Sequence, residues 1–229
     1  LRDNLSIAVS AKVRIFPELE ETIKYAKMIE KAGADFITVH GRTRSQKSFG
    51  LANWDYIKEI KKSVNIPVIA NGNIQTFNDV QKCLEYTGVN AVMTADALLY
   101  NPSVFTGKSL KCWESAQILL EYYDKYKETH YKSCKYVLYK LYVPILEICP
   151  NFGERISKSR TIEDLFSLNR HVEKALTPLL ESFSTNPEMY MTKLWLPFWI
   201  NQARFRSDES DHNYRSLSNN SELVESFLP

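Results

Sequence analysis

The chain has 229 residues, enough for one large domain or two modest ones, and 44% of them are hydrophobic. That composition excludes an intrinsically disordered chain, because a substantial core can be buried. The formal net charge of +2 is close to balanced and by itself says nothing about a nucleic-acid partner. No stretch resembles a signal peptide or a membrane span, so we expect a protein of the cytoplasm or nucleus with no membrane partner.

The cysteines argue against a metal site. None of them has the CxxC or CxxH spacing that metal ligands require, so they are expected to be separate reduced thiols. They are Cys83, Cys112, Cys134 and Cys149. We therefore expect no bound metal.

Residues 1–107 alternate between strand-like and helix-like patterns. Strands are expected at 5–15, 35–40, 66–72 and 89–95. Helices are expected at 17–32, 53–64 and 76–88, and another begins at 96–105. Asn53 and Thr76 are suitable N-caps, while Gly33 and Gly88 are typical residues for ending a helix.

The spacing of these elements favours a barrel. Strand starts recur roughly every 25 to 30 residues, the period of βα units in a parallel sheet, and no G-x-G-x-x-G motif is present. A closed (β/α)8 TIM barrel has eight such units, and only four occur here. The chain also begins at Leu1 and not at Met. We therefore predict an α/β fold in which residues 1–107 form the C-terminal half of a (β/α)8 barrel.

Residues 108–183 show helical patterns without a strand signal, which predicts an all-α helical-bundle domain after the half-barrel. Residues 184–229 combine an aromatic segment with a Ser/Asn-rich tail that is expected to be disordered. The aromatic residues Trp195, Phe198 and Trp199 have two interpretations: a cap on a hydrophobic surface, or a docking site for a partner. The sequence does not distinguish them.

Strand parity brings three polar residues together. Residues with the parity of Val13, Ile37 and Val39 form apolar faces that should pack on helices. The opposite parity turns Lys12 and His40 toward the barrel interior. Asn71, at the end of the next strand, shares that direction. All three would meet at the C-terminal mouth, where barrel enzymes build their active sites.

Each of these residues also has a purely structural interpretation: a lysine that reaches solvent, a core histidine, and an Asn-Gly turn. Three of them at equivalent positions of successive strands are harder to explain in that way. Together they suit an anionic heteroaromatic ligand, because they combine a cation, ring hydrogen-bond donors and backbone amides next to glycine.

Four stretches of sequence then carry a family resemblance. "AKVRI", "VHGRTRSQK", "IPVIANGNI" and "GVNAVMTADALLYNPSVF", in this order and at these spacings, resemble the flavin-dependent tRNA-dihydrouridine synthases. The chain is most similar to the eukaryotic branch that acts on D-loop positions 16 and 17. The likeness covers Leu1 to about Leu180 and includes the family's C-terminal RNA-binding domain.

The resemblance implies reduction of uridine to 5,6-dihydrouridine in tRNA, with FMN as cofactor and NADPH as reductant. It assigns Lys12 and His40 to the flavin, with His40 also near the uracil, and it assigns the phosphate to the loops after the last two strands. The implied cofactor-binding residues are Lys12, His40, Asn71, Gly72, Asn73, Thr94 and Ala95. A monomer is expected.

RNA contact is expected at two places. Arg42 and Arg44 lie in the loop at the barrel mouth, where the resemblance places RNA. In the helical segment, basic residues alternate with tyrosines that could stack on bases, although a solvated helix face with core tyrosines is the alternative. The expected RNA-binding residues are Arg42, Arg44, Lys132, Lys135, Lys140, Arg155, Lys158 and Arg160.

The chain departs from the family's pattern in two ways. Where many relatives have a Gly-Arg pair after the last strand, this chain has "TADALLYNP", so phosphate binding there would rely on backbone amides. The family's proton-donating cysteine would lie upstream of Leu1, so we expect no catalytic residue in this chain and no turnover by the chain alone. Two alternatives remain: a non-catalytic RNA-binding protein, and another FMN-dependent pyrimidine oxidoreductase.

Overall fold

A computed structural model describes residues 2–108, 110–126, 130–149, 151–183 and 197–202. The described residues separate into two compact units on either side of the Ala95–Asp96 junction. The sequence pattern placed the boundary at residue 107. The observed boundary lies before residue 107 because helix α4 (Asp96–Tyr100) packs within the second unit. There the Tyr100 hydroxyl accepts a hydrogen bond from Lys140 Nζ at 3.2 Å.

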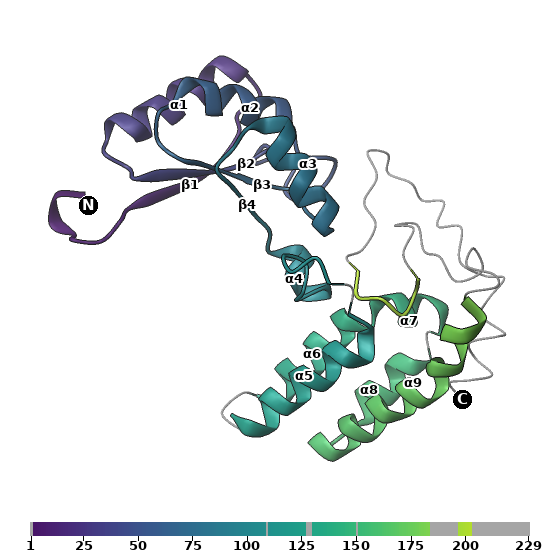
Figure 1. The fold of residues 1–229 in the computed structure, drawn as a ribbon. Helices are drawn as coiled ribbons and strands as arrows, with labels where there is room; N and C mark the ends of the chain where they lie inside the picture. The colour runs from purple at the N-terminus through teal and green to yellow at the C-terminus, as the bar shows by residue number, and fades with distance from the viewer. Residues whose placement is uncertain (1, 109, 127–129, 150, 184–196, 203–229) are drawn as a thin grey trace. The chain divides into compact units, whose positions relative to one another are not determined.

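The first unit is an α/β fold with a four-stranded parallel sheet. Its strands are β1 (Ser10–Arg14), β2 (Phe36–His40), β3 (Val68–Asn71) and β4 (Ala91–Met93), and they lie in the order β1-β2-β3-β4. Helices α1 (Leu19–Lys31), α2 (Trp54–Ser63) and α3 (Phe77–Thr87) connect them and cover one face of the sheet (Figure 1). A short 3-10 helix, η1 (Arg2–Asn4), precedes β1.

The predicted start and stop signals account for the helix ends. The Asn53 side chain accepts a hydrogen bond from the Tyr56 amide at 3.0 Å and caps α2. Thr76 and Asp79 form a reciprocal capping box at the start of α3, and Gly88 ends that helix with φ of 68°. These local hydrogen bonds satisfy backbone groups that the first and last turns of a helix leave without intrahelical partners.

The core of the first unit lies between the sheet and its helices. The strand residues Ile37, Val39 and Val68 are fully buried in this core, as the strand parity predicted. Ile57 and Ile60 of α2 are buried in the same core. The prediction was wrong at the start of the first strand: β1 begins at Ser10, and the Ile7 side chain is 68% exposed. Ile7 precedes the segment of β1 that pairs with β2, so it lies outside the face of the sheet that the helices cover.

The second unit is helical in the residues that are described. Besides α4 it contains α5 (Cys112–Lys125), α6 (Tyr131–Leu141), α7 (Val143–Ile148), α8 (Phe152–Lys158) and α9 (Ile162–Phe183). Its core is built from large side chains with almost no exposed surface, such as Leu120, Leu138, Ile145 and Phe152. It also contains an isolated antiparallel bridge between Lys111 and Ile200.

That bridge belongs to a short C-terminal segment, residues 197–202, which packs onto the helices. The Cys112 amide donates to the Trp199 carbonyl at 2.7 Å, and the Asn201 amide donates to the Leu110 carbonyl at 2.9 Å. Phe198 and Trp199 are 1% and 3% exposed. These two aromatic residues therefore cap the hydrophobic core of the helical unit, whereas Trp195 and the expected disordered tail lie outside the described residues.

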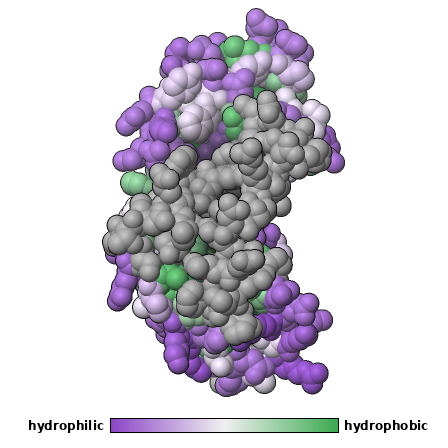
Figure 2. Space-filling model, turned by 90° about the vertical axis from the view of Figure 1, so that its right-hand side faces the viewer, coloured by the Kyte–Doolittle hydropathy of each residue, from purple (hydrophilic) through white to green (hydrophobic). Residues whose placement is uncertain are grey.

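On the face drawn in Figure 2, hydrophilic side chains dominate the coloured surface of each unit and the hydrophobic patches are small. No helix in the described ranges combines the length and the apolar character that crossing a membrane requires.

Candidate functional site

The strand register places the predicted polar residues on one face of the sheet, opposite the helices. The Cα partners Arg14↔His40 and His40↔Asn71 form one row at the carboxyl ends of the strands. Lys12 pairs with Thr38 in the row below, two residues earlier on its strand. Lys12, His40 and Asn71 thus share a face of three adjacent strands, as the sequence parity predicted.

Of the two cations that β1 places on this face, Lys12 is exposed and Arg14 is half-buried. Although Lys12 as a whole is exposed, its ammonium is partly buried, and this burial, followed by the positive charge of Arg14, lowers the pKa of the ammonium below the ordinary value of a lysine. Both causes act against the charged form. An anion beside Lys12 would relieve this cost, so the site favours a negatively charged ligand over a neutral one.

Arg14 was not among the residues predicted for the site, although it lies on the same face as Lys12. One of its terminal nitrogens, Nη1, donates to the backbone carbonyls of Thr43 at 3.0 Å and Lys47 at 2.8 Å. Arg14 therefore anchors the loop after β2. Its strand parity was the available signal, but parity cannot show that a side chain bends to reach a loop.

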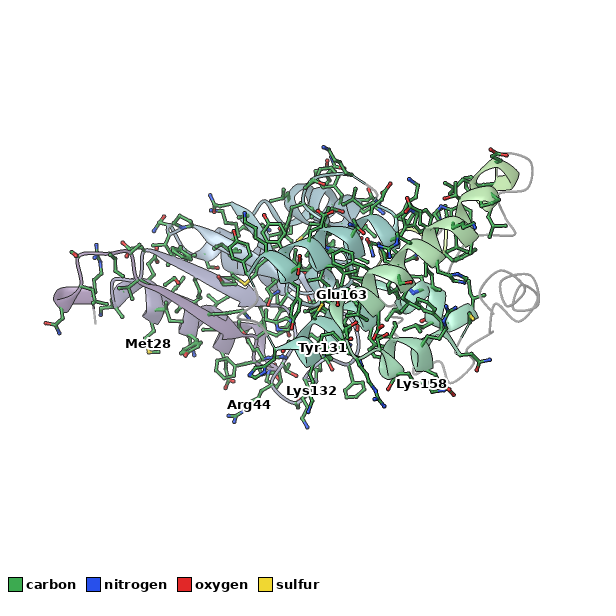
Figure 3. The ribbon with its side chains drawn as sticks, turned by 90° about the horizontal axis from the view of Figure 1, so that it is seen from below. Met28, Arg44, Tyr131, Lys132, Lys158 and Glu163 are labelled. Carbon is green, nitrogen blue, oxygen red and sulfur yellow. The ribbon has the colours of Figure 1, made fainter. Side chains whose placement is uncertain are left out.

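Arg42 has different surroundings from those the sequence suggested. Its side chain is 2% exposed, and its guanidinium contacts three groups. Nε donates to the Gly50 carbonyl at 2.8 Å, Nη2 donates to Asn73 Oδ1 at 2.7 Å, and Nη1 lies 3.3 Å from His40 Nε2. These contacts favour a role inside the site over the RNA contact that was expected. Arg44, two residues later, is exposed and projects outward from its loop (Figure 3).

Two glycines allow close approaches of the backbone here: Gly41 brings together the two ends of the loop after β2, and Gly72 brings the loop after β3 close to that loop. A Cβ atom on Gly41 would lie 2.8 Å from the Asn53 carbonyl oxygen. One on Gly72, whose φ is 111°, would lie 2.7 Å from Ala52 Cβ and 3.0 Å from His40 Cδ2. A larger residue at Gly41 would force the ends of the loop after β2 apart, and one at Gly72 would push that loop away from the loop after β3.

Further hydrogen bonds hold the loops after β3 and β4. The Trp54 indole donates to the Gly72 carbonyl at 3.1 Å, which adds Trp54 to the residues that the sequence did not reveal. Asn71 Nδ2 donates to the Met93 carbonyl at 2.9 Å, and the Thr94 hydroxyl donates to the Ile74 carbonyl at 2.9 Å. The adjacent Ala95 is exposed. The loops expected to bind phosphate are therefore joined to one another at their bases.

A partly open cavity of about 370 Å³ lies beside these loops. It is lined by residues from the loop before α2 and the start of that helix, and from the segment between β3 and α3 and the first turn of α3. They are Leu51, Ala52, Trp54, Asn73, Gln75 and Asp79. Asn73 is thus both a wall of the cavity and the acceptor of a hydrogen bond from Arg42.

In the helical unit, the predicted RNA-binding residues fall into two groups. Lys135 Nζ donates to the Ser157 and Ser159 carbonyls at 2.6 and 2.9 Å, and Lys140 bonds to Tyr100, so both lysines make internal contacts. Lys132, Lys158 and Arg160 are exposed, and Arg155 is half-buried. Figure 3 shows Lys132 and Lys158 projecting from the helices.

The start of α6 lies close to the segment between α8 and α9. Besides the Lys135 contacts, the Tyr131 hydroxyl donates to the Thr161 carbonyl at 2.9 Å. Lys132, Lys158 and Arg160 are exposed basic residues of the segments that these contacts join, and we refer to these three residues together as the basic patch. Lys158 forms a salt bridge with Glu154, whose carboxylate lies 2.9 Å from Lys158 Nζ.

A protein-family comparison agrees with this arrangement. The family model described as "Dihydrouridine synthase (Dus)" matches residues 1–186. The chain belongs to the dihydrouridine synthase family. This confirms the resemblance carried by the strand-end motifs, because the match runs through all four strands and most of the described helical unit.

Similarity to curated members of the dihydrouridine synthase family is consistent with the predicted branch. The chain is 42% identical over 173 residues to a mouse protein named tRNA-dihydrouridine(16/17) synthase [NAD(P)(+)]-like, and covers 36% of that protein. It is 37% identical over 181 residues to the Schizosaccharomyces pombe tRNA-dihydrouridine(16/17) synthase, of which it covers 45%. These matches use 73% and 72% of this chain. The chain thus spans less than half the length of these relatives.

The cysteines of this family member do not reach the polar face of the sheet. All four are free and buried, one in the core of the first unit and three in the helical unit. Burial raises the pKa of Cys83 and of Cys134 to about 11, and it raises the pKa of Cys112 further. In the part of the chain that the structure describes, no cluster of three or more His, Cys, Asp or Glu residues is arranged to hold a metal ion.

Proposed function

We propose that this chain is the part of a tRNA-dihydrouridine synthase that holds FMN and contacts tRNA. The whole enzyme would reduce uridine in the D-loop to 5,6-dihydrouridine, with NADPH as the reductant. The observation that carries the proposal is the shared face of Lys12, His40 and Asn71 at the carboxyl end of the sheet. The names of the relatives, which specify tRNA-dihydrouridine and NAD(P)(+), support the substrate and the reductant.

The half-barrel belongs to this proposal. Sequential strand order with all connecting helices on one face is how a (β/α)8 barrel winds, whereas a doubly wound sheet reverses its order and uses both faces. Among the described residues, β1 and β4 each pair with one neighbouring strand only. We propose that these four units form half of such a barrel and that the helical unit is its tRNA-binding domain.

The residues present fit FMN. A flavin mononucleotide combines a phosphate with a heteroaromatic ring, and it supplies the hydride for the uracil C5–C6 double bond when bound. Lys12 would lie beside the ring and favour negative charge there, and His40 would form a hydrogen bond to it. Gly72, Asn73, Thr94 and Ala95 would hold the phosphate through backbone amides in loops that are already joined.

This chain's own contribution is to bind and orient. Lys12 would stabilise negative charge on the ring, and the close contacts made by Gly41 and Gly72 would hold the loops around the ligand in place. The buried cysteines leave proton donation to uracil C5 to a group outside the described part of this chain. The basic patch, together with Arg44, would bind tRNA phosphates.

Flavin titration tests the cofactor site directly. We expect FMN fluorescence to be quenched saturably by the purified chain, and Lys12→Ala to weaken this binding about tenfold while tRNA affinity stays nearly constant. Lys132→Glu combined with Lys158→Glu should have the reverse effect and reduce the salt dependence of tRNA binding. A chain that bound tRNA tightly and showed no saturable FMN binding would instead be an RNA-binding protein without a cofactor.

A further inference from the structure

The loop between β2 and α2 exposes an aromatic side chain. Phe49 is 76% exposed, more than any other large hydrophobic residue in the described ranges. A phenyl ring has no polar atom that gains from contact with water, so its burial against a partner would be favourable. A single exposed ring needs no explanation by itself, and the surroundings of Phe49 therefore decide what it can do.

The backbone that carries Phe49 is anchored to β1. Arg14 Nη1 donates to the Thr43 carbonyl at 3.0 Å and to the Lys47 carbonyl at 2.8 Å. Within the loop, the Phe49 amide donates to the Gln46 carbonyl at 2.8 Å, and the Thr43 amide donates to Gln46 Oε1, also at 2.8 Å. The loop is therefore ordered by its own hydrogen bonds. A preformed loop loses little conformational entropy when it binds a partner.

Two residues that flank Phe49 have a left-handed backbone, with φ of 52° at Lys47 and 68° at Gly50. The carbonyl of each accepts a hydrogen bond from an arginine. Lys47 accepts from Arg14 at 2.8 Å, and Gly50 accepts from Arg42 Nε at 2.8 Å. A residue other than glycine keeps this conformation only where its surroundings fix it. The two arginines thus fix the turns on either side of the exposed ring.

The charge around Phe49 is positive. Residues 36–54 contain Arg42, Arg44 and Lys47 and no Asp or Glu. Arg44 and Lys47 are exposed, and Arg44 projects outward (Figure 3). The loop thus combines an apolar ring with two cations that face solvent. This combination suits a polyanion that also offers flat rings, and it disfavours a basic partner or a purely apolar one.

We propose that Phe49 stacks on an unpaired base of an RNA while Arg44 and Lys47 bind the phosphates beside that base. Bases in RNA loops are open to stacking on aromatic side chains, whereas bases in a duplex are stacked on one another. A free mononucleotide is not the favoured partner, because so exposed a ring offers one contact face and no enclosing pocket. The inference rests on the proposed function, which brings tRNA to this edge of the sheet.

Substitutions at Phe49 distinguish stacking from a merely apolar contact. In binding titrations with a tRNA transcript, we expect Phe49→Leu to weaken affinity about tenfold and Phe49→Trp to retain it, because only an aromatic ring stacks on a base. Phe105→Leu, at an exposed position of the helical unit, is the matched control and should leave the affinity unchanged. Equal tRNA affinities in Phe49→Leu and the unsubstituted chain would overturn the inference.

Salt dependence separates the ring from the cations. Arg44→Gln and Lys47→Gln should each reduce the slope of log affinity against log salt by about 1, because each removes one phosphate contact. Phe49→Leu should weaken binding and leave that slope unchanged. A change of slope in Phe49→Leu, with none in the two cation variants, would contradict these assignments.

A fluorescent base locates the stacked nucleotide. We expect 2-aminopurine, placed in turn at each D-loop position of the transcript, to report stacking at an unpaired position with the unsubstituted chain and not with Phe49→Leu. A blunt duplex of the same stem should bind the two proteins equally. Discrimination on the duplex, or a stacking signal that does not depend on Phe49, would contradict the proposal.

The proposed function and this inference can fail separately, because FMN titration provides a readout that does not involve Phe49. A chain that binds no FMN but binds tRNA in a Phe49-dependent manner would refute the cofactor role and leave the inference intact. A chain that binds both FMN and tRNA, with the same tRNA affinity in Phe49→Leu, would do the opposite.

Discussion

At the scale of single residues, the two arginines of "HGRTR" show how neighbouring side chains of one type can acquire different roles. Arg42 is almost fully buried and bonded to three groups in the first unit, whereas Arg44 projects outward. A loop has no periodicity from which the direction of a side chain can be read. The difference arises from Gly50, His40 and Asn73, which folding brings around Arg42.

Lys12 leads to a prediction about pH. Its pKa is lowered, so it loses its positive charge at a lower pH than an ordinary lysine does. Below that pKa the ammonium attracts an anionic ligand, and above it the attraction is lost. FMN affinity should therefore fall about tenfold as the pH rises through the lysine range, with its midpoint below the ordinary value, in fluorescence titrations at a series of pH values.

The Lys12→Arg variant is the control for that titration. Arginine keeps its charge throughout the accessible range, so the affinity of this variant should not fall over the same interval. A fall of equal size in Lys12→Arg or Lys12→Ala would assign the pH dependence to another group.

Gly72 leads to a prediction about stability. Gly72→Ala combines a φ of 111° with a contact of 2.7 Å to Ala52 Cβ, and we expect it to destabilise the first unit by about 3 kcal/mol. Gly88→Ala has a φ of 68° and nothing within 4 Å of the added atom, so it should cost only about 1 kcal/mol. Urea unfolding of both variants measures the difference, and equal costs would show that the loops separate easily.

At the scale of elements, α6 shows that a basic stripe in the sequence need not be a basic surface. Lys132 is exposed, but Lys135 reaches the carbonyls at the end of α8, where a cation is favoured by the helix dipole. Lys140 bonds to Tyr100 and lies over its ring, 5.0 Å from the centroid. The packing of α6 on its neighbours thus leaves Lys132 exposed and gives Lys135 and Lys140 contacts within the helical unit.

Two lysines of α6 provide a matched pair of variants. Lys135→Met should lower the free energy of unfolding of the helical unit by about 1–2 kcal/mol, because two hydrogen bonds from a charged group are lost. Lys132→Met should change stability by less than about 0.5 kcal/mol and instead weaken tRNA binding. Thermal unfolding and gel-shift titrations measure the two effects, and a stability loss in Lys132→Met alone would reverse the assignment.

At the scale of the whole molecule, each unit has its own hydrophobic core. The core of the helical unit includes Phe198 and Trp199, which lie beyond the 186 residues that the family model matches. Cys112 and Asn201 provide the backbone hydrogen bonds that hold this segment. The segment 197–202 therefore belongs to the structure of the helical unit.

Removal of one aromatic side chain tests that conclusion. Phe198→Ala should destabilise the helical unit by about 3–5 kcal/mol, because it empties a fully buried site. Phe105→Ala, at a position that is 43% exposed, should cost less than about 1 kcal/mol. Hydrogen exchange should show faster exchange in the helices and unchanged exchange in the sheet. Equal loss of protection in both units would show that they unfold together.

The sequence by itself determined the parallel order of strands and helices, the helix caps and the polar face. These features depend on periodicity, capping and strand parity, all of which act over a few residues. It also identified the family, whose motifs lie at strand ends. Only the tertiary structure decided that Arg42 is internal, that Lys135 and Lys140 bind within the helical unit, and that α4 belongs to that unit. Each of these outcomes depends on partners that are distant in the sequence, and local patterns carry no information about them.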